Sequence, residues 1–257
     1  MSDVATIPAR RPGPRAWAAL VAAEAKMVMR DTSGLVIPFG LPLLVLVMNG
    51  LSSRDADDLA GYSVFEGYVL PVALTMVVAV IGVVNMPSFL AYYRRSKVLR
   101  RLAVTPANPG MILVAQVVVS LAQSMVGVAL GVGAAMLFFD VGLPANLGTA
   151  LAVFGLAALS MYAVGMFVAA VAPSGNAAVA IGLSLFFAFG ATGGMFGPTE
   201  VLPGPIAVIG EALPFGAAVK AFGAAWIGAD LNPAHLIAMV VAIAVSSAVA
   251  VAAFRWD

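Results

Sequence analysis

The 257-residue chain is 62% hydrophobic and only 10% charged, with a formal net charge of +1. Soluble globular domains are closer to half apolar and about a quarter charged, so this composition excludes a soluble domain and indicates an integral membrane protein. The balanced charge gives no overall attraction to nucleic acid, and a chain without cysteine has neither disulfides nor thiolate metal sites.

Residues 1–14 are rich in proline and arginine, and no apolar run follows them at once. A cleavable signal peptide needs such a run, so this segment is not one. We expect a disordered cytoplasmic tail at 1–14 and a single transmembrane domain at 15–257.

A helical crossing of a membrane needs about 20 mainly apolar residues, because lipid offers no hydrogen-bond partner to the backbone. Six stretches meet this requirement, which predicts an all-α protein with six transmembrane helices. They run roughly from Leu35 to Leu51, Phe65 to Met86, Met111 to Phe139, Leu147 to Val171, Ala177 to Phe196 and Pro233 to Phe254.

The stretch from Gly197 to Asn232 is also apolar, but it contains four prolines and, among its charged residues, Glu200, Glu211 and Lys220. Pro214 divides it into Pro205 to Leu213 and Phe215 to Ile227, and each piece is too short to cross a membrane. We therefore expect a re-entrant or interfacial helical hairpin between the fifth and sixth spans.

Lysine and arginine in short loops favour the cytoplasmic side. If the N-terminus is cytoplasmic, Arg54 and Lys220 are the only lysine and arginine residues outside, whereas most of the acidic residues lie outside. Both termini are therefore predicted to be cytoplasmic, as six spans require, and the hairpin is predicted to be extracellular.

The segment from Tyr92 to Pro109, YYRRSKVLRRLAVTPANP, joins the second and third spans and gathers five cations. At 100° per residue, Arg94, Lys97, Arg100 and Arg101 share an arc of about 120°, and Arg95 breaks the pattern. Its apolar side consists of Tyr92, Val98, Leu99 and Leu102. The segment is either a topology anchor whose arginines bind anionic lipid heads, or an amphipathic helix presented to a soluble partner.

A resemblance favours the second interpretation. The stretch RRSKVLRRLAVTPANPGMILVAQ resembles the cytoplasmic loop of type 2 ABC exporter permeases, in which a basic helix ends in Thr-Pro before the third span. In that family the loop lies against the ATPase subunit. The resemblance therefore implies that contact with an ATPase is made by Arg94, Arg95, Lys97, Leu99, Arg100, Arg101 and Leu102.

Two other regions share this resemblance. AEAKMVMRDTSGLVIPFGLPLLVLV, from Ala23, is similar to the family's amphipathic connecting helix and first span, with Glu24, Lys26 and Arg30 on the helix. PTEVLPGPIAVIGEALPFGAAVKAFGAAW, from Pro198, is similar to its extracellular re-entrant hairpin. The matching positions there are Leu202, Pro203, Glu211, Pro214 and Lys220.

The resemblance implies a permease subunit of an ATP-driven exporter in a prokaryotic cell membrane. The chain has no GxxxxGK motif followed by Ser or Thr, so ATP and Mg²⁺ are expected in a separate ATPase subunit; the chain itself is expected to be neither an enzyme nor a cofactor-binding protein. The other expected partners are a second permease copy and membrane lipids, and the low charge of the spans favours an apolar or amphipathic cargo.

Polar residues within the predicted spans are amides and hydroxyls, including Asn49, Asn85, Gln116, Gln123, Thr75, Ser120, Ser124, Ser160 and Ser184. Hydrogen bonding between helices is the expected role, and contact with cargo is the alternative. The GxxxG motifs at Gly127–Gly131, Gly190–Gly194 and Gly193–Gly197 indicate close helix packing, within the subunit or at a dimer face.

Three other functions remain as alternatives. A secondary transporter usually keeps an ionisable coupling residue within its spans, and here only Glu66 and His235 lie near them, at the outer ends. A membrane enzyme acting on lipids would need convergent catalytic groups, which the scattered cytoplasmic acids do not supply. A non-transporting membrane component is the third alternative.

Overall fold

The computed structural model describes residues 13–53, 63–95 and 110–253, all of them in helices or short connections, with no strand in these ranges. Six helices there are long and apolar enough to cross a membrane, which confirms the predicted number of spans. Residues 1–12 of the tail predicted at 1–14 and the acidic loop around Asp55 lie outside the described residues, and Pro14 begins the first helix.

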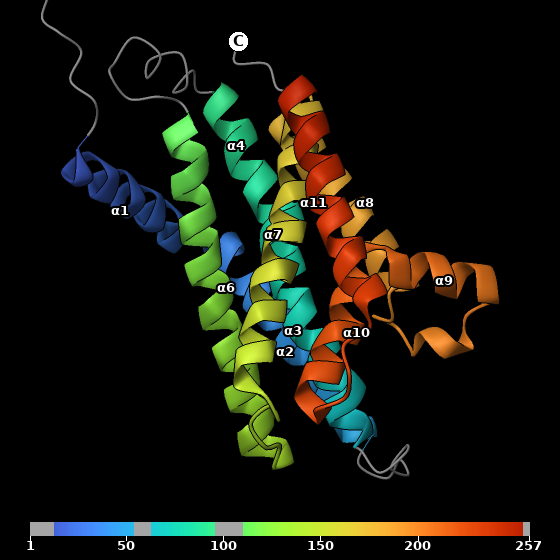
Figure 1. Ribbon diagram of the computed structural model, residues 1–257. Helices are drawn as coiled ribbons and strands as arrows, with labels where there is room; N and C mark the ends of the chain where they lie inside the picture. The colour runs from blue at the N-terminus through green and yellow to red at the C-terminus, as the bar shows by residue number, and fades with distance from the viewer. Residues whose placement is uncertain (1–12, 54–62, 96–109, 254–257) are drawn as a thin grey trace, which may run out of the picture.

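The first span follows a shorter helix that runs obliquely to the bundle (Figure 1). Helix α1 covers Pro14–Arg30 and α2 covers Thr32–Ser52, with Asp31 between them in an extended conformation. The Oδ1 atom of Asp31 accepts a hydrogen bond of 3.1 Å from the backbone N–H of Ser33 and so caps α2. Helix α2 therefore begins three residues before the predicted start at Leu35.

The second span lies in the middle of the bundle and is almost wholly buried by the other helices. It consists of η1 (Phe65–Val69), α3 (Leu70–Ala79), η2 (Val80–Asn85) and α4 (Met86–Arg95). The two η segments are π-helical, a conformation that is rare in helices and frequent at functional sites. The span reaches Arg95, so the first residues of the basic segment continue this helix instead of starting a separate one.

The next three spans are α6 (Gly110–Phe139), α7 (Leu147–Val171) and α8 (Gly175–Thr192). The starts of α7 and α8 are capped by the side chains of Asn146 and Ser174, which accept hydrogen bonds from backbone N–H groups three residues later. Helix α8 ends at Thr192, four residues before the predicted boundary, because Gly193 and Gly194 follow and Gly194 adopts a left-handed φ of 97°.

The hairpin comes next and the last span closes the bundle. A 3₁₀ turn, η3 (Thr199–Val201), precedes α9 (Gly204–Ala212) and α10 (Pro214–Ile227), and α11 covers Pro233–Ala253. Helices α9 and α10 meet at 81°, and their 9 and 14 residues span roughly 14 and 21 Å, which is less than the hydrocarbon thickness of about 30 Å. Two short helices at this angle are compatible with the predicted re-entrant hairpin.

The bundle is tightest where η2 passes α7 and α8. A Cβ atom added at Gly165 would collide with the carbonyl oxygen of Gly82, and one added at Gly182 would collide with the carbonyl oxygen of Val83. Small residues of this kind let membrane helices pack backbone against backbone. The sequence analysis did not single out these glycines, because none of them forms a GxxxG pair.

Two glycines of the predicted GxxxG motifs also pack within the subunit. A Cβ atom at Gly127 would lie 2.5 Å from Val77 and 2.9 Å from Phe39, and one at Gly193 would lie 2.7 Å from the backbone N of Gly216. At these two positions the expectation of close packing inside the chain is confirmed.

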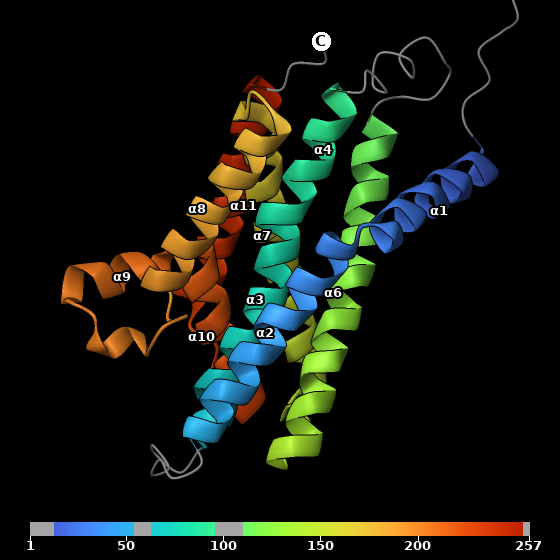
Figure 2. The same ribbon diagram turned by 180° about the vertical axis from the view of Figure 1, so that it is seen from behind.

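The helices are arranged so that the start of α1, the end of α4, the start of α6 and the end of α11 lie at one end of the bundle (Figures 1 and 2). We call this the terminal end. The hairpin helix α10 lies toward the other end, which we call the hairpin end, and α9 projects sideways from the bundle at about its middle height (Figures 1 and 2).

Candidate functional site

The terminal end carries the first of the predicted ATPase contacts. Arg94 and Arg95 form the last turn of α4. Lys97, Leu99, Arg100, Arg101 and Leu102 lie outside the described residues, so the helix predicted for them stays a prediction.

The predicted connecting helix is present as α1, which packs against α6 (Figure 2). Its three predicted residues differ in environment: Lys26 and Arg30 are exposed, whereas Glu24 is only 3% exposed. The hydroxyl of Tyr93 donates a hydrogen bond of 2.6 Å to Oε1 of Glu24, while Oε2 has no partner among the described residues. Burial raises the pKa of Glu24, and the hydrogen bond from Tyr93 opposes the rise.

This contact joins α1 to the last turns of the second span. Tyr93 lies on α4 directly before Arg94 and Arg95, so the helix that carries the first cations is also bonded to the connecting helix. The sequence analysis missed Tyr93 as a contact residue. The available signal was the position of Glu24 four residues before Val28, which places the acid on the same face of the helix as an apolar residue, where a carboxylate requires a donor from a neighbouring element.

A second connection lies at the start of α2. The carbonyl oxygen of Gly34 accepts hydrogen bonds from Nε2 of Gln123 at 2.7 Å and from Nδ2 of Asn85 at 2.9 Å. Gln123 comes from α6 and Asn85 from η2, so this one carbonyl joins the first three spans.

The other polar residues of the spans divide into three groups. Ser124 pairs with the hydroxyl of Tyr162 on α7 at 2.7 Å, so with Asn85 and Gln123 it makes the predicted bonds between helices. Asn49, Ser160 and Ser184 bond to carbonyls of their own helices. Thr75 Oγ1 and Gln116 Oε1 are buried without a partner among the described residues.

At the hairpin end, the hairpin is fixed by backbone contact at glycines. A Cβ atom at Gly210 on α9 would collide with the carbonyl oxygen of Thr192 at the end of α8, and one at Gly216 would collide with the carbonyl oxygen of Gly210. The predicted residues Leu202 and Pro203 lie between η3 and α9, and Pro214 begins α10. Proline at a first helical position loses no hydrogen bond, so all of these positions suit their residues.

Charged residues of three elements meet beside the hairpin. Lys220 Nζ on α10 lies 2.5 Å from Oε1 of Glu200 and 3.4 Å from Oε1 of Glu211. Oε1 of Glu211 also accepts a hydrogen bond of 2.9 Å from Thr199, and its Oε2 lies 3.9 Å from Nε2 of His235 on α11. Two of the predicted hairpin residues, Glu211 and Lys220, are thus brought together, and Glu200 and His235 join them.

The charge of Lys220 changes the titration of its nearest neighbour. Burial by itself raises the pKa of Glu200, but the hydrogen bond and charge of Lys220 outweigh this effect and hold the pKa below its usual value. Glu200 is therefore ionised at neutral pH.

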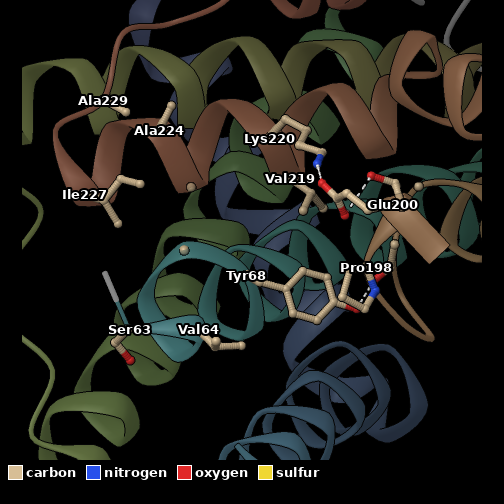
Figure 3. Close-up of a pocket in the computed structure, with 15 residues that line it drawn as sticks. Ser63, Val64, Tyr68, Pro198, Glu200, Val219, Lys220, Ala224, Ile227 and Ala229 are labelled. Atoms are coloured by element: carbon tan, nitrogen blue, oxygen red, sulfur yellow. Dashed lines mark hydrogen bonds and ion pairs between the residues drawn. The ribbon is translucent and has the colours of Figure 1, made fainter. Parts of the chain in front are cut away.

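A cavity of about 480 Å³ opens between the first turns of the second span and α10 (Figure 3). Its walls include the apolar side chains of Val64, Val219 and Ile227, and the ion pair of Glu200 and Lys220 lies at one end. The hydroxyl of Tyr68 crosses the space and donates a hydrogen bond of 2.6 Å to the carbonyl of Gly194. Mostly apolar walls with a few polar groups are typical of small-molecule sites.

The described residues contain no group of three or more His, Asp or Glu side chains that could hold a metal ion. The acidic cluster around Asp55, Asp57 and Asp58 lies outside them.

Comparison with known proteins agrees with this architecture. The family model described as ABC-2 type transporter matches residues 15–226, which is more than half of the chain. No curated protein matched the sequence. The matched range includes α1, the first five spans, the basic segment and nearly all of the hairpin. The chain therefore belongs to the ABC-2 type transporter family and is the multi-pass membrane component of an ABC transporter, a permease whose family associates with ABC ATPase subunits.

Proposed function

We propose that this permease exports an apolar or amphipathic compound from a prokaryotic cell, using ATP and Mg²⁺ bound by a separate ATPase subunit. The observation that carries the proposal is the bond between Tyr93 and Glu24. This bond connects α1 to the end of α4, where the basic segment begins. A force applied to the basic segment is therefore transmitted to both α1 and α4.

In this mechanism both termini and the terminal end of the bundle face the cytoplasm. The cations from Arg94 to Arg101 bind an ATPase subunit, with Leu99 and Leu102 on the apolar side of their helix. Closure of the ATPase subunits moves this segment and α1, and the movement opens the pathway outward. A second permease copy completes the pathway, because six spans from one chain form only half of it.

The cavity at the hairpin end supports the choice of cargo. Its walls are mainly apolar, and charged groups are confined to the contact of Lys220 with Glu200 at one end. An amphipathic compound has the matching combination of an apolar body and a polar group. The hairpin itself is proposed to face the outside.

The first test is recovery of an ATPase with the tagged permease from detergent extracts. We expect the parent to bring down an ABC ATPase, and a variant with Arg94, Lys97, Arg100 and Arg101 changed to Glu to lose it. A control that exchanges the same four residues between Lys and Arg keeps the charge and should retain the ATPase. If no preparation brings down an ATPase, the cations act as a topology anchor and the chain is a non-transporting component.

Export is tested with cells that accumulate two dyes, ethidium as an amphipathic cation and Nile red as a neutral apolar probe. Expression of the permease with its ATPase should lower the accumulation of at least one dye, and a catalytically inactive ATPase should abolish the effect. Efflux that persists with the inactive ATPase and stops when the proton gradient is dissipated would instead establish secondary transport.

A further inference from the structure

The backbone carbonyl of Gly34 is available to neighbouring helices because it has no partner within α2. In an α-helix, the N–H of each residue donates to the carbonyl four residues earlier. Residue 38 is a proline and has no N–H, and a proline ring also pushes against the carbonyl four residues before it. The carbonyl of Gly34 therefore has no donor within its own helix and is turned toward neighbouring elements.

The two side-chain amides replace the missing donor. A carbonyl oxygen has two lone pairs and accepts two hydrogen bonds, which here come from Gln123 and Asn85. Gly34, Pro38 and Gln123 are buried, so water does not compete for the bond from Gln123, and the bond from the half-buried Asn85 is partly shielded. A carbonyl without a donor in such surroundings is costly, and this cost favours keeping both amides in place.

The location of this contact gives it a mechanical consequence. Gly34 lies four residues after Arg30, the last residue of α1, and Asp31 between the two helices is extended. The side chain of Asp31 lies beside Gly34, so that a Cβ atom added at Gly34 would be 2.9 Å from its Oδ2. The turn between α1 and α2 is thus fastened to the second and third spans at one point.

We propose that Asn85 and Gln123 are positioning residues that make α1 and the first three spans move together. The proposal rests on the proposed function, because it is the ATPase that displaces α1. Pro38 contributes to this arrangement, because an N–H at residue 38 would occupy one of the two lone pairs within α2 and leave room for only one of the two amides.

The experiment uses the absence of cysteine from the chain. Cysteines introduced at the exposed positions Ala19 on α1 and Met125 on α6 would be the only sites for two spin labels. Pulsed electron resonance on the full chain in lipid nanodiscs then gives the distribution of distances between α1 and α6. The variants are Asn85→Leu and Gln123→Met, which keep the approximate shape and remove the donors.

The parent is expected to give one narrow distribution, and the variant with both changes a broad one. Asn49→Leu is the matched control, because Asn49 bonds to Val45 of its own helix and should leave the distribution narrow. If both changes together prevent folding, each single variant retains one amide and should give an intermediate width. A narrow distribution in the double variant, or in both single variants, would overturn the proposal.

The Pro38→Ala variant tests whether Asn85 and Gln123 link the helices mechanically or only supply hydrogen bonds to the carbonyl of Gly34. Added to the double variant, it supplies the missing N–H, so the melting temperature should return toward that of the parent while the distribution stays broad. Recovery of a narrow distribution would mean that the amides only satisfy the carbonyl, and the proposed link would be wrong.

A final arm adds the ATPase and a non-hydrolysable ATP analogue. The distance from α1 to α6 should stay constant in the parent, where the two helices move together, and should change in the double variant. An equal change in both proteins would contradict the proposal. The measurements without ATPase do not depend on the proposed function, so failure to find an ATPase and failure of the link give different results.

Discussion

Tyr93 donates a hydrogen bond of 2.6 Å to Glu24 across 69 positions of sequence, and this bond joins the end of the second span to the buried side of α1. It places an ionisable group inside the contact between the connecting helix and the bundle. The contact is therefore expected to depend on pH.

The first prediction concerns Glu24→Gln. Burial raises the pKa of Glu24, so the folded protein binds this proton more tightly than the unfolded chain does. The contribution of Glu24 to stability is greatest below its ordinary pKa of 4.5, falls as pH rises from there through the raised pKa, and then levels. Glutamine stays neutral, so the Glu24→Gln variant should not show this decrease in stability with rising pH. Thermal unfolding in detergent measures the difference. Parallel curves for the two proteins across this range would contradict the role of Glu24.

The second prediction concerns Tyr93→Phe, which removes the hydroxyl and keeps the ring. A hydrogen bond to a charged acceptor contributes roughly 1.5–3 kcal/mol, and one between neutral groups about 0.5–1.5 kcal/mol. The variant should therefore lose more stability above the pKa of Glu24 than below it. In the Glu24→Gln background the loss should become small and independent of pH, as a double-mutant cycle measured by thermal unfolding would reveal.

The third prediction concerns the packing of η2 against α7. Gly165→Ala places a methyl group against the backbone carbonyl of Gly82, which cannot rotate away, and overpacking of this kind costs roughly 1–3 kcal/mol or more. Gly155→Ala is the matched control, because it lies on the same helix with nothing within 4 Å of its added Cβ. The control should be neutral or stabilising, since alanine favours helix over glycine. Equal melting temperatures for the two variants would show that the contact between residue 165 and Gly82 accommodates the added methyl group.

The fourth prediction concerns Lys220→Met at the hairpin end. Lys220 holds the pKa of Glu200 below its usual value, so the pair stabilises the fold above pH 4.5 and loses this contribution as pH falls through the lowered pKa. Because Glu200 is largely exposed, the loss in the variant should be only about 0–1 kcal/mol at neutral pH.

Unfolding of the parent and the Lys220→Met variant between about pH 3 and 7 would test this small effect. The two curves should converge at the acid end, where Glu200 is protonated in both proteins. A difference that persists there would assign the role of Lys220 to packing of its aliphatic chain.

The six spans were predictable because each is a long apolar segment whose backbone bonds are internal to the helix. In five of the six spans, both the start and the end lie within a few residues of the predicted boundaries. The second span differs most, since it continues to Arg95 beyond the predicted end at Met86. Apolarity is a weak guide at that point, because the helix continues into a polar, cationic turn where water and lipid head groups accept it.

Less of the candidate sites than of the fold could be predicted from the sequence. The pairing of Glu211 with Lys220 follows from two predicted hairpin residues, but their contact with Glu200 and His235 depends on how the hairpin folds back on α11. Similarly, Pro38 in a predicted span indicates a free carbonyl at Gly34, whereas the identity of the two donors does not follow from the sequence.

The sequence by itself determined the membrane environment, the number of spans, the division at Pro214 and the concentration of cations after the second span. These are local properties, since they depend on the length and polarity of contiguous segments. Only the tertiary structure decided that Tyr93 meets Glu24, that Gln123 and Asn85 share the carbonyl of Gly34, and that Gly82 lies against Gly165. Each of these contacts joins residues far apart in the chain, and which helix faces meet is set by packing of the whole bundle, because lipid is as apolar as most of the side chains and does not select the faces that turn inward.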